Sequence, residues 1–219
     1  MNLAPYIQHT AIEAGLTRDD IVRHCEEAAQ YGFNAAMIPA SWVPLAAEVL
    51  RGTGVAVASA LDFPIVGVMT SAGKVAEARA IAEAGADQLD MGVQVGWLRS
   101  GMDKEFHDDI AGVVAAGIPV KVMLELPLLT EAEKERAVEL SMEAGAAYLK
   151  NASSGSVEIA NTGSISWLAA RVRDGVQVKA SGGIKSAEQA RELLAAGATL
   201  LGTSAGISIV KGETAEGSY

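Results

Sequence analysis

The sequence contains little cysteine, few aromatic residues and no long apolar run. Its 219 residues include one cysteine, and 5% of them are aromatic. A single cysteine cannot form a disulfide within the chain, so we interpret Cys25, inside an expected helix over Arg18–Tyr31, as a packing residue. Because 50% of the residues are hydrophobic, the core must consist mainly of Ala, Val, Leu and Ile.

Targeting signals and basic surfaces are also missing. No segment reaches the ~18 apolar residues typical of a membrane-spanning helix, and the first residues lack the basic and apolar segments of a secretory signal. The formal net charge is −10, which disfavours nucleic acids and anionic membranes as partners. We expect a cytoplasmic protein that acts on a small molecule. An anionic small molecule is compatible with this charge, because a few local donors suffice to bind it.

Glycines recur in front of apolar, β-rich segments at spacings of 22 to 32 residues. Each follows a helical pattern, and glycine just past a helix readily adopts the left-handed conformation that ends it. The glycines are Gly32, Gly54, Gly85, Gly117, Gly145, Gly175 and Gly197. A unit of helix, glycine and strand of this length is typical of a βα repeat.

Eight expected strands alternate with these helices. We expect the strands at Tyr6–His9, Asn34–Ile38, Val55–Leu61, Gln88–Val93, Val120–Glu125, Tyr148–Lys150, Val176–Lys179 and Thr199–Gly202. Capping-box patterns at Thr17, Thr130 and Ser186 mark three helix starts. This order predicts an α/β fold, a (β/α)8 TIM barrel, rather than a doubly wound open sheet. We assign residues 1–211 to a single barrel domain and residues 212–219 to a flexible C-terminal tail.

Charged residues lie at the ends of several expected strands, where such barrels carry their functional groups. Lys150 and Lys179 end two neighbouring strands, and Asp90 lies between apolar residues that face helices, so its side chain must face the interior. One ammonium lowers the pKa of another, and a lysine with a lowered pKa is a usual nucleophile toward carbonyl groups. These three residues are the catalytic candidates. A purely structural ion network is the alternative. Further candidates at strand ends are Lys121, Thr10 and Gln8.

Glycine-containing loops after the last strands predict a phosphate site. Barrels commonly bind phosphate there through backbone N–H groups, which glycine leaves accessible. The candidates are Gly182, Gly183 and Lys185 after the seventh strand, Gly202 and Ser204 after the eighth, and Ser153 and Ser154 after the sixth. Ordinary turn glycines are the alternative interpretation.

Five segments together resemble the deoxyribose-phosphate aldolases, a family of class I aldolases. They are Ala86–Met91, Val120–Glu125, Tyr148–Lys150, Val178–Ile184 and Gly202–Gly206. The resemblance implies a Schiff-base lysine at Lys150, a second lysine at Lys179 and a proton-relay aspartate at Asp90. It implies phosphate contacts at Gly182, Gly183, Lys185 and Ser204. Some aldolases of this type end in a tyrosine that assists proton transfer, which makes Tyr219 a candidate beside the alternative of a disordered end.

The reaction implied by this resemblance is the reversible cleavage of 2-deoxy-D-ribose 5-phosphate to acetaldehyde and glyceraldehyde 3-phosphate through a lysine imine and enamine. It needs no metal or organic cofactor, and the three histidines show no metal-ligand spacing. In this mechanism Lys179 lowers the pKa of Lys150, so that Lys150 loses its proton near pH 7.

Three other functions remain open. They are a Schiff-base aldolase for another sugar phosphate or an unphosphorylated aldehyde, a phosphate-binding barrel isomerase, and a non-catalytic binding protein. A homo-oligomer, such as a dimer, is compatible with each of them.

The chain departs from the family pattern around the substrate. Gln8-His9-Thr10 stands where the family usually has Asp-His-Thr, and Met37-Ile38-Pro39-Ala40 stands in place of Cys-Val-Asn-Pro. Asn151-Ala152-Ser153-Ser154 replaces the usual Thr-Ser-Thr-Gly. The three catalytic candidates are intact, which supports aldolase chemistry and leaves the exact substrate open.

Overall fold

The structure is a computed structural model that describes residues 1–219, the whole chain. Eight parallel strands follow one another around a closed barrel, and the last strand pairs with the first. The strands are β1 Ile7–Thr10, β2 Ala35–Met37, β3 Ala56–Leu61, β4 Gln88–Gly92, β5 Val120–Met123, β6 Tyr148–Lys150, β7 Gln177–Ser181 and β8 Leu200–Thr203. The predicted (β/α)8 barrel is confirmed, and the expected strand ends agree with the observed ones to within two residues.

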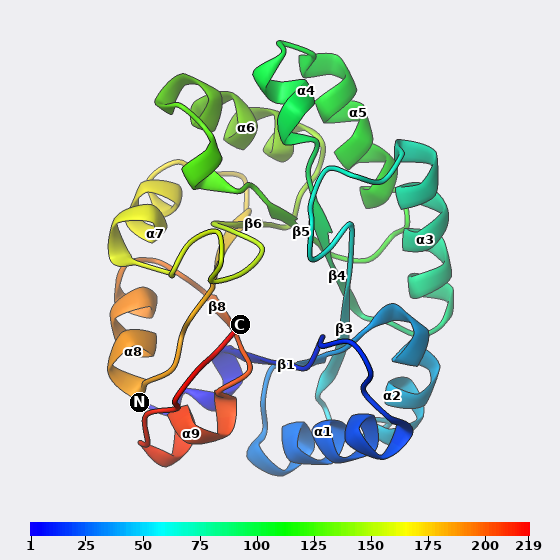
Figure 1. Cartoon of the computed structure of the whole chain (residues 1–219), viewed down its shortest axis with the longest axis vertical. Helices are drawn as coiled ribbons and strands as arrows, with labels where there is room; N and C mark the ends of the chain where they lie inside the picture. Colours follow the sequence, from blue (N-terminus) through cyan, green and yellow to red (C-terminus); the bar gives the residue numbers. More distant parts are fainter.

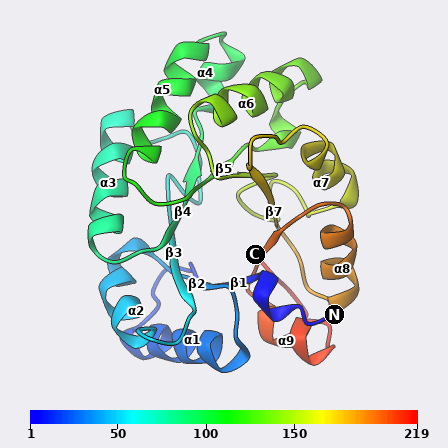
Figure 2. The same ribbon diagram turned by 180° about the vertical axis from the view of Figure 1, so that it is seen from behind.

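Helices surround the barrel on all sides (Figures 1 and 2). They are α1 Arg18–Tyr31, α2 Val43–Val49, α3 Ser71–Glu83, α4 Val95–Arg99, α5 Asp103–Val114, α6 Glu131–Glu143, α7 Thr162–Ala169, α8 Ala187–Ala195 and α9 Gly206–Lys211, with short 3-10 helices at Ala4–Tyr6, Ala40–Trp42 and Leu126–Leu128. None of them is long and apolar enough to cross a membrane. All seven glycines of the repeat have positive φ, as the helix–glycine–strand pattern predicts.

The predicted helix starts are present, with one difference. Thr17 and Thr130 form complete capping boxes at α1 and α6. The Ser186 hydroxyl accepts from the Gln189 backbone N–H at α8, but the Gln189 side chain accepts from the Lys185 N–H instead of closing the box. The cap of α8 therefore also orders the loop that precedes it.

The core lies mainly between the barrel and its helices, where 47 buried residues form one cluster. Cys25 belongs to this cluster, and burial raises the pKa of its thiol to about 11, as expected for a packing residue. Inside the barrel a small apolar group of Ala35, Met37 and Ala58 lies on β2 and β3. Strands β4 to β7 place the ionisable side chains Asp90, Lys121, Lys150 and Lys179 in the interior, opposite this apolar group.

Candidate active site

Three buried lysines converge on one carboxylate inside the barrel. Strand pairing aligns Asp90 with Lys121, Met123 with Lys150, and Lys150 with Lys179, so all four charged side chains face the interior. The Asp90 Oδ2 atom accepts from Lys179 Nζ at 2.7 Å and from Lys150 Nζ at 3.2 Å. The Asp90 Oδ1 atom lies 3.3 Å from Lys121 Nζ. Two amines therefore share a single carboxylate oxygen.

The three lysines differ in the number of acceptors that they meet. Lys150 Nζ is within hydrogen-bond reach of Asp90, of Met123 Sδ at 3.7 Å and of the Ser153 carbonyl at 3.4 Å. Lys179 Nζ donates to Asp90 and to Gln8 Oε1, at 2.6 Å. Lys121 Nζ has only its ion pair with Asp90, without hydrogen-bond alignment. Only Lys150 can use all three protons of an ammonium group.

The pKa values follow these surroundings. Burial alone would raise the pKa of Asp90, but Lys179, Lys121 and Lys150 hold it well below its usual range. Burial lowers the pKa of Lys179 to about 8 despite the attraction of Asp90, and burial also lowers the pKa of Lys121. Burial lowers the pKa of Lys150 too, but the neighbouring Tyr219 and Asp90 outweigh it and leave the value above the ordinary one.

This result corrects the expectation drawn from the sequence, in which the pKa of Lys150 was the lowered one. The low value falls on Lys179, because burial and the charges of Lys150 and Lys121 lower its pKa, whereas Tyr219 and Asp90 outweigh burial at Lys150. Near neutral pH the resting site therefore holds a protonated Lys150 beside a lysine that can accept a proton.

A small cavity opens at Lys150 toward the carboxyl ends of the strands. It is lined by Thr10, Ile12, Met37, Ala60, Phe63, Asp90, Met123, Lys150 and Tyr219. Apart from Thr10, Asp90, Lys150 and the Tyr219 hydroxyl, this lining is apolar. The Thr10 hydroxyl already donates to the Gln8 carbonyl at 3.0 Å. The volume of the cavity is about 10 Å3 with Tyr219 in place, so this mainly apolar space has room for no more than a very small group beside Lys150.

A larger pocket of about 500 Å3 lies beside this cavity, over the loops after β6 and β7. Its lining includes three predicted phosphate residues, Ser154, Gly183 and Lys185, together with Ser156, Gln189 and residues of the tail. The remaining candidates do not line it. A Cβ at Gly182 would lie 2.2 Å from the Glu158 carbonyl oxygen, so Gly182 permits a close approach of two loops.

Two other phosphate candidates have different surroundings from those expected. The Ser153 N–H donates to Glu125 Oε1 at 2.6 Å and is not free to bind phosphate. Gly202 lies deeper, where a Cβ would approach Ser181, Tyr219 and Lys179. The Ser204 hydroxyl accepts from the Tyr219 N–H at 3.4 Å.

The C-terminal segment, expected to be flexible, lies in this structure against the same loops. The Gly183 N–H donates to the Tyr219 carbonyl oxygen at 2.7 Å, and the Ala215 N–H donates to the Lys185 carbonyl at 3.0 Å. The Tyr219 ring centroid is 6.0 Å from Lys150 Nζ. In Figure 1 the chain end accordingly lies beside β8 and β1, at the inner side of the ring of strands. Residue 219 thus belongs to the site, while the Gly183 donor is occupied.

Sequence comparisons find relatives of known name along the whole chain. The deoxyribose-phosphate aldolase of Geobacillus sp. (strain WCH70) is 42% identical over 221 residues, covering 100% of this chain and 99% of the relative. The enzyme of the same name from Bacillus subtilis (strain 168) is 39% identical, covering 99% and 98%. The chain belongs to the deoxyribose-phosphate aldolase family. No family model matches it.

Solved aldolase structures superpose closely. The tetrameric deoxyribose phosphate aldolase of Aeropyrum pernix has a TM-score of 0.87 and 29% identity, covering 95% of this chain and 89% of its own. An aldolase named QR15 has a TM-score of 0.89 and 28% identity, covering 96% and 95%. The fold and the family expected from the sequence are therefore confirmed.

Glu125 is a residue of this aldolase site whose position differs from the expected one. The alternation of the expected strand Val120–Glu125 places it on the same side as Lys121, but β5 ends at Met123 and Glu125 has a left-handed backbone with φ 54°. Its carboxylate is fully buried and fixes the peptide of Ser153, whose carbonyl accepts from Lys150. Burial raises the pKa of Glu125. The signal in the sequence is the acidic residue at the end of the apolar expected strand Val120–Glu125.

A second network supports the loop after β3. Lys74 Nζ is fully buried and contacts Asp62 at 3.0 Å, Asp109 at 2.8 Å and the Gly92 carbonyl at 2.8 Å. Asp62 in turn accepts from the backbone N–H groups of residues 67–69. The same loop carries Phe63 into the cavity at Lys150. Sequence patterns do not indicate this network, because Lys74 lies within a helix and its partners Asp62, Gly92 and Asp109 are distant along the chain.

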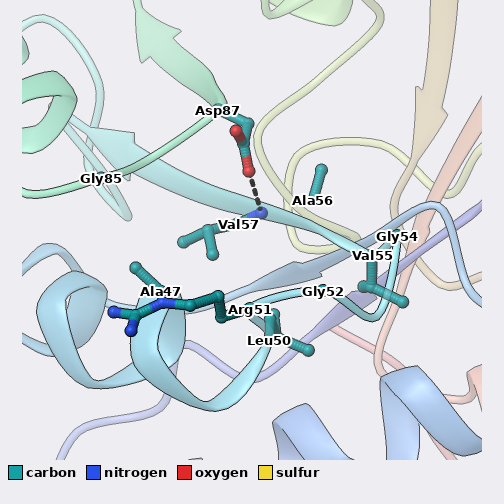
Figure 3. A pocket seen from close by; sticks show the side chains of 10 residues that line it. All are labelled: Ala47, Leu50, Arg51, Gly52, Gly54, Val55, Ala56, Val57, Gly85 and Asp87. Carbon is teal, nitrogen blue, oxygen red and sulfur yellow. Dashed lines mark hydrogen bonds between the residues drawn. The ribbon is translucent and has the colours of Figure 1, made fainter.

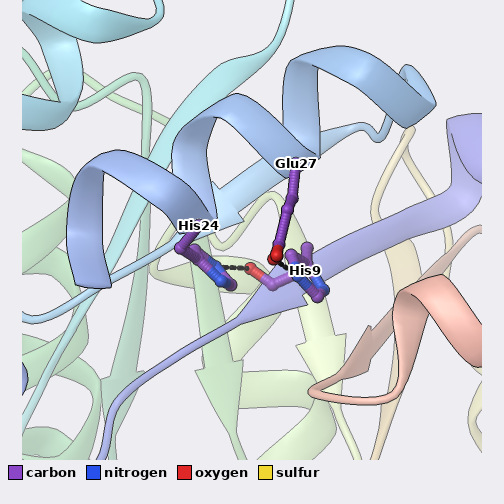
Figure 4. Close-up of side chains that lie close together, drawn as sticks. All are labelled: His9, His24 and Glu27. Atoms are coloured by element: carbon purple, nitrogen blue, oxygen red, sulfur yellow. Dashed lines mark hydrogen bonds and ion pairs between the residues drawn. The ribbon is translucent and has the colours of Figure 1, made fainter. Parts of the chain in front are cut away.

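Two histidines, which show no metal-ligand spacing in the sequence, come together behind β1. His9 Nε2 lies 3.5 Å from Glu27, and the His24 Nε2–H donates to the His9 carbonyl oxygen at 3.0 Å (Figure 4). Burial lowers the pKa of both imidazoles to about 4. The rings stack with centroids 4.2 Å apart and planes 13° apart, so their in-plane lone pairs do not meet at the ~2.1 Å that a metal bond requires.

A hollow of about 480 Å3 lies at the opposite end of the barrel (Figure 3). The residues around it belong to the end of α2 and to the starts of β3 and β4. Asp87 is its only acidic residue, and its carboxylate accepts from the Val57 N–H at 2.8 Å. None of the candidate site residues lines it.

Proposed function

We propose that this protein cleaves 2-deoxy-D-ribose 5-phosphate reversibly to acetaldehyde and glyceraldehyde 3-phosphate, as a class I aldolase with Lys150 as the Schiff-base residue. The observation that carries the proposal is the single oxygen, Asp90 Oδ2, shared by the amines of Lys150 and Lys179. This arrangement joins a nucleophile to a proton acceptor in the buried interior of the barrel. The names of the relatives support the same reaction.

The first step activates Lys150. Its ammonium passes a proton through Asp90 to Lys179, which is partly neutral near pH 7 to 8 because its pKa is about 8. The neutral Lys150 amine attacks the C1 aldehyde of the open-chain sugar and forms a carbinolamine. Loss of water, with the proton returned through the same relay, gives the iminium ion.

The second step breaks the bond between C2 and C3. The C3 hydroxyl gives its proton to the relay of Asp90 and Lys179, the C2–C3 electrons move into the iminium, and glyceraldehyde 3-phosphate leaves an enamine on Lys150. Protonation at C2 followed by hydrolysis releases acetaldehyde and restores the amine. The apolar lining of the cavity suits the methyl group formed at C2. We propose the Tyr219 hydroxyl, beside Lys150, as a donor for the C2 proton.

Phosphate binding is proposed at the pocket formed by Ser154, Gly183 and Lys185. The Gly183 N–H is occupied by the Tyr219 carbonyl, so we propose that residues 212–219 are mobile and move when phosphate enters. Lys185 supplies the positive charge that a phosphate dianion requires on an otherwise acidic protein. Gly182, Gly202, Ser153 and Ser204 then shape the neighbouring loops rather than bind phosphate directly.

Covalent trapping tests the assignment. The protein is incubated with acetaldehyde and borohydride, and the modified residue is located by peptide mass mapping. The reduced adduct is expected on Lys150 and should be lost in Lys150→Met. Lys121→Met, which removes another buried lysine of the same cluster, should keep it. An adduct on Lys179, or one that persists in Lys150→Met, contradicts the proposal, and no adduct at all would favour a barrel isomerase.

Assembly and location complete the proposal. We propose a homo-oligomer, by analogy with the tetrameric relative from Aeropyrum pernix, and light scattering at micromolar concentration tests it. We also propose a cytoplasmic location, consistent with a single buried cysteine and no disulfide.

A further inference from the structure

Gln8 on β1 is held in one orientation inside the barrel. It is fully buried, and its Nε2 donates to Gln88 Oε1 at 2.6 Å and to Asn34 Oδ1 at 3.1 Å. Its Oε1 accepts from Lys179 Nζ at 2.6 Å. The side chains of Asn34 and Gln88 use both N–H groups of the amide, so the oxygen must point at Lys179. Gln8 is therefore a fixed, uncharged acceptor.

The contacts of Lys179 match a neutral amine. An ammonium has three N–H groups and a neutral amine has two. Lys179 Nζ meets two acceptors, Gln8 Oε1 and Asp90 Oδ2. A third proton would be buried without a partner, and an unpaired buried donor costs about 1–3 kcal/mol. The geometry around Lys179 thus favours the form that can accept a proton.

The charges that face Lys179 come from four directions. Asp90 on β4 is the one carboxylate, Lys121 on β5 and Lys150 on β6 are cationic, and Tyr219 of the tail approaches beside them. On β8 the facing residue is Gly202, which has no side chain. Gln8 on β1 is the last neighbour and carries no charge. One carboxylate thus faces three lysines.

We propose that Gln8 is a positioning residue that aims the Lys179 amine at Asp90 and, being uncharged, leaves Lys179 able to accept the proton of Lys150 near neutral pH. The inference rests on the proposed aldolase function, because it assigns the control of that site's protonation. A carboxylate at this position would pair with Lys179 and keep it protonated. A side chain without an acceptor would release the amine from its position.

Three variants separate these effects. Gln8→Glu replaces the amide by a carboxylate of the same shape, and Gln8→Met removes the acceptor at similar volume. Asn34→Asp is the matched control, because it adds the same charge one side chain further from Lys179. The ionisation of Lys179 is read directly by NMR of protein labelled with 13C-lysine, with its signal assigned by its absence from Lys179→Arg. Imine trapping with acetaldehyde is measured over the same pH range.

In Gln8→Glu the NMR midpoint of Lys179 should rise by at least one pH unit, since an opposite charge at this distance shifts a pKa by about 1–3 units. Imine formation at pH 7 should fall about tenfold or more and recover at higher pH. Asn34→Asp should shift the midpoint less. Gln8→Met should slow imine formation at every pH without raising the midpoint.

An unchanged Lys179 midpoint in Gln8→Glu overturns the inference, and so does full activity of Gln8→Met at all pH values. The NMR titration does not depend on catalysis. If the wild-type protein forms no imine while the midpoint still shifts, the proposed function fails and the control of Lys179 by Gln8 stands. If Gln8→Glu does not fold, the titrations of the other two variants decide. An unchanged Lys179 midpoint in Asn34→Asp, or a raised Lys179 midpoint in Gln8→Met, refutes the inference.

Discussion

Lys179→Met should change how the stability of the barrel depends on pH. The ordinary lysine pKa is about 10.4, and burial in the folded protein lowers that of Lys179 to about 8. Between these two values the unfolded chain binds more protons than the folded one, so this residue makes wild-type stability rise with pH. The lowered pKa of Lys179 decreases the free energy of unfolding by about 3 kcal/mol at pH 7 and by about 1 kcal/mol at pH 9.5.

The variant lacks this titration, so its free energy of unfolding minus that of the wild type should fall by about 2 kcal/mol between pH 7 and pH 9.5. Asp90 stays ionised over this range because Lys121 and Lys150 remain beside it. Urea unfolding followed by both circular dichroism and tryptophan fluorescence gives the two free energies, with coincident transitions as the check on two-state behaviour. Lys211→Met, at an exposed lysine, corrects for the loss of one positive charge.

A difference that stays constant within about 0.5 kcal/mol from pH 7 to 9.5 would refute the reasoning, because Lys179 would then titrate at its ordinary value. A difference that grows with pH would reverse the sign and assign the low pKa to another group. Either result would also remove the proton acceptor from the proposed mechanism.

Three further outcomes are expected. Lys74→Met leaves Asp62 and Asp109 buried without their cation, so urea unfolding should show a loss of about 3–5 kcal/mol. Glu125→Ala removes the acceptor for the buried Ser153 N–H, so it should lower the free energy of unfolding by about 1–3 kcal/mol and slow imine trapping. Glu125→Gln keeps an acceptor and should lose less stability and less trapping rate. Equal losses in the two variants would contradict this. Gly183→Val, at φ 62°, should raise KM for deoxyribose 5-phosphate at least tenfold more than KM for deoxyribose, and equal effects on both would indicate a fold defect.

The barrel and the position of its charges could be predicted because strands have a period of two residues. Once Asp90, Lys150 and Lys179 were assigned to strands, their common side followed from parity, and the pairing of the strands brought them into contact. Five of the seven glycines, all except Gly54 and Gly175, likewise mark helix ends through a backbone conformation that few other residues adopt.

The ionisation of these lysines could not be predicted in the same way. Whether Lys150 or Lys179 has the low pKa depends on how burial balances the neighbouring charges, and the largest effect that raises the pKa of Lys150 comes from Tyr219, at the far end of the chain. The left-handed backbone of Glu125 ended its strand two residues early and removed it from the expected face. The position of Tyr219 depends on contacts between the tail and loops far away in the sequence.

Gly202 determines how far the chain end can enter the barrel. A Cβ there would lie 2.5 Å from the Tyr219 hydroxyl and 2.4 Å from Ser181 Oγ, so one methyl group would fill the space that the phenol occupies. Its φ is not in the left-handed region, so a larger residue is excluded by the neighbours and not by the backbone. Tail and barrel are therefore a matched pair. A chimaera that combines this tail with another aldolase barrel can bring its tyrosine to the lysines only where the receiving eighth strand also leaves this position empty.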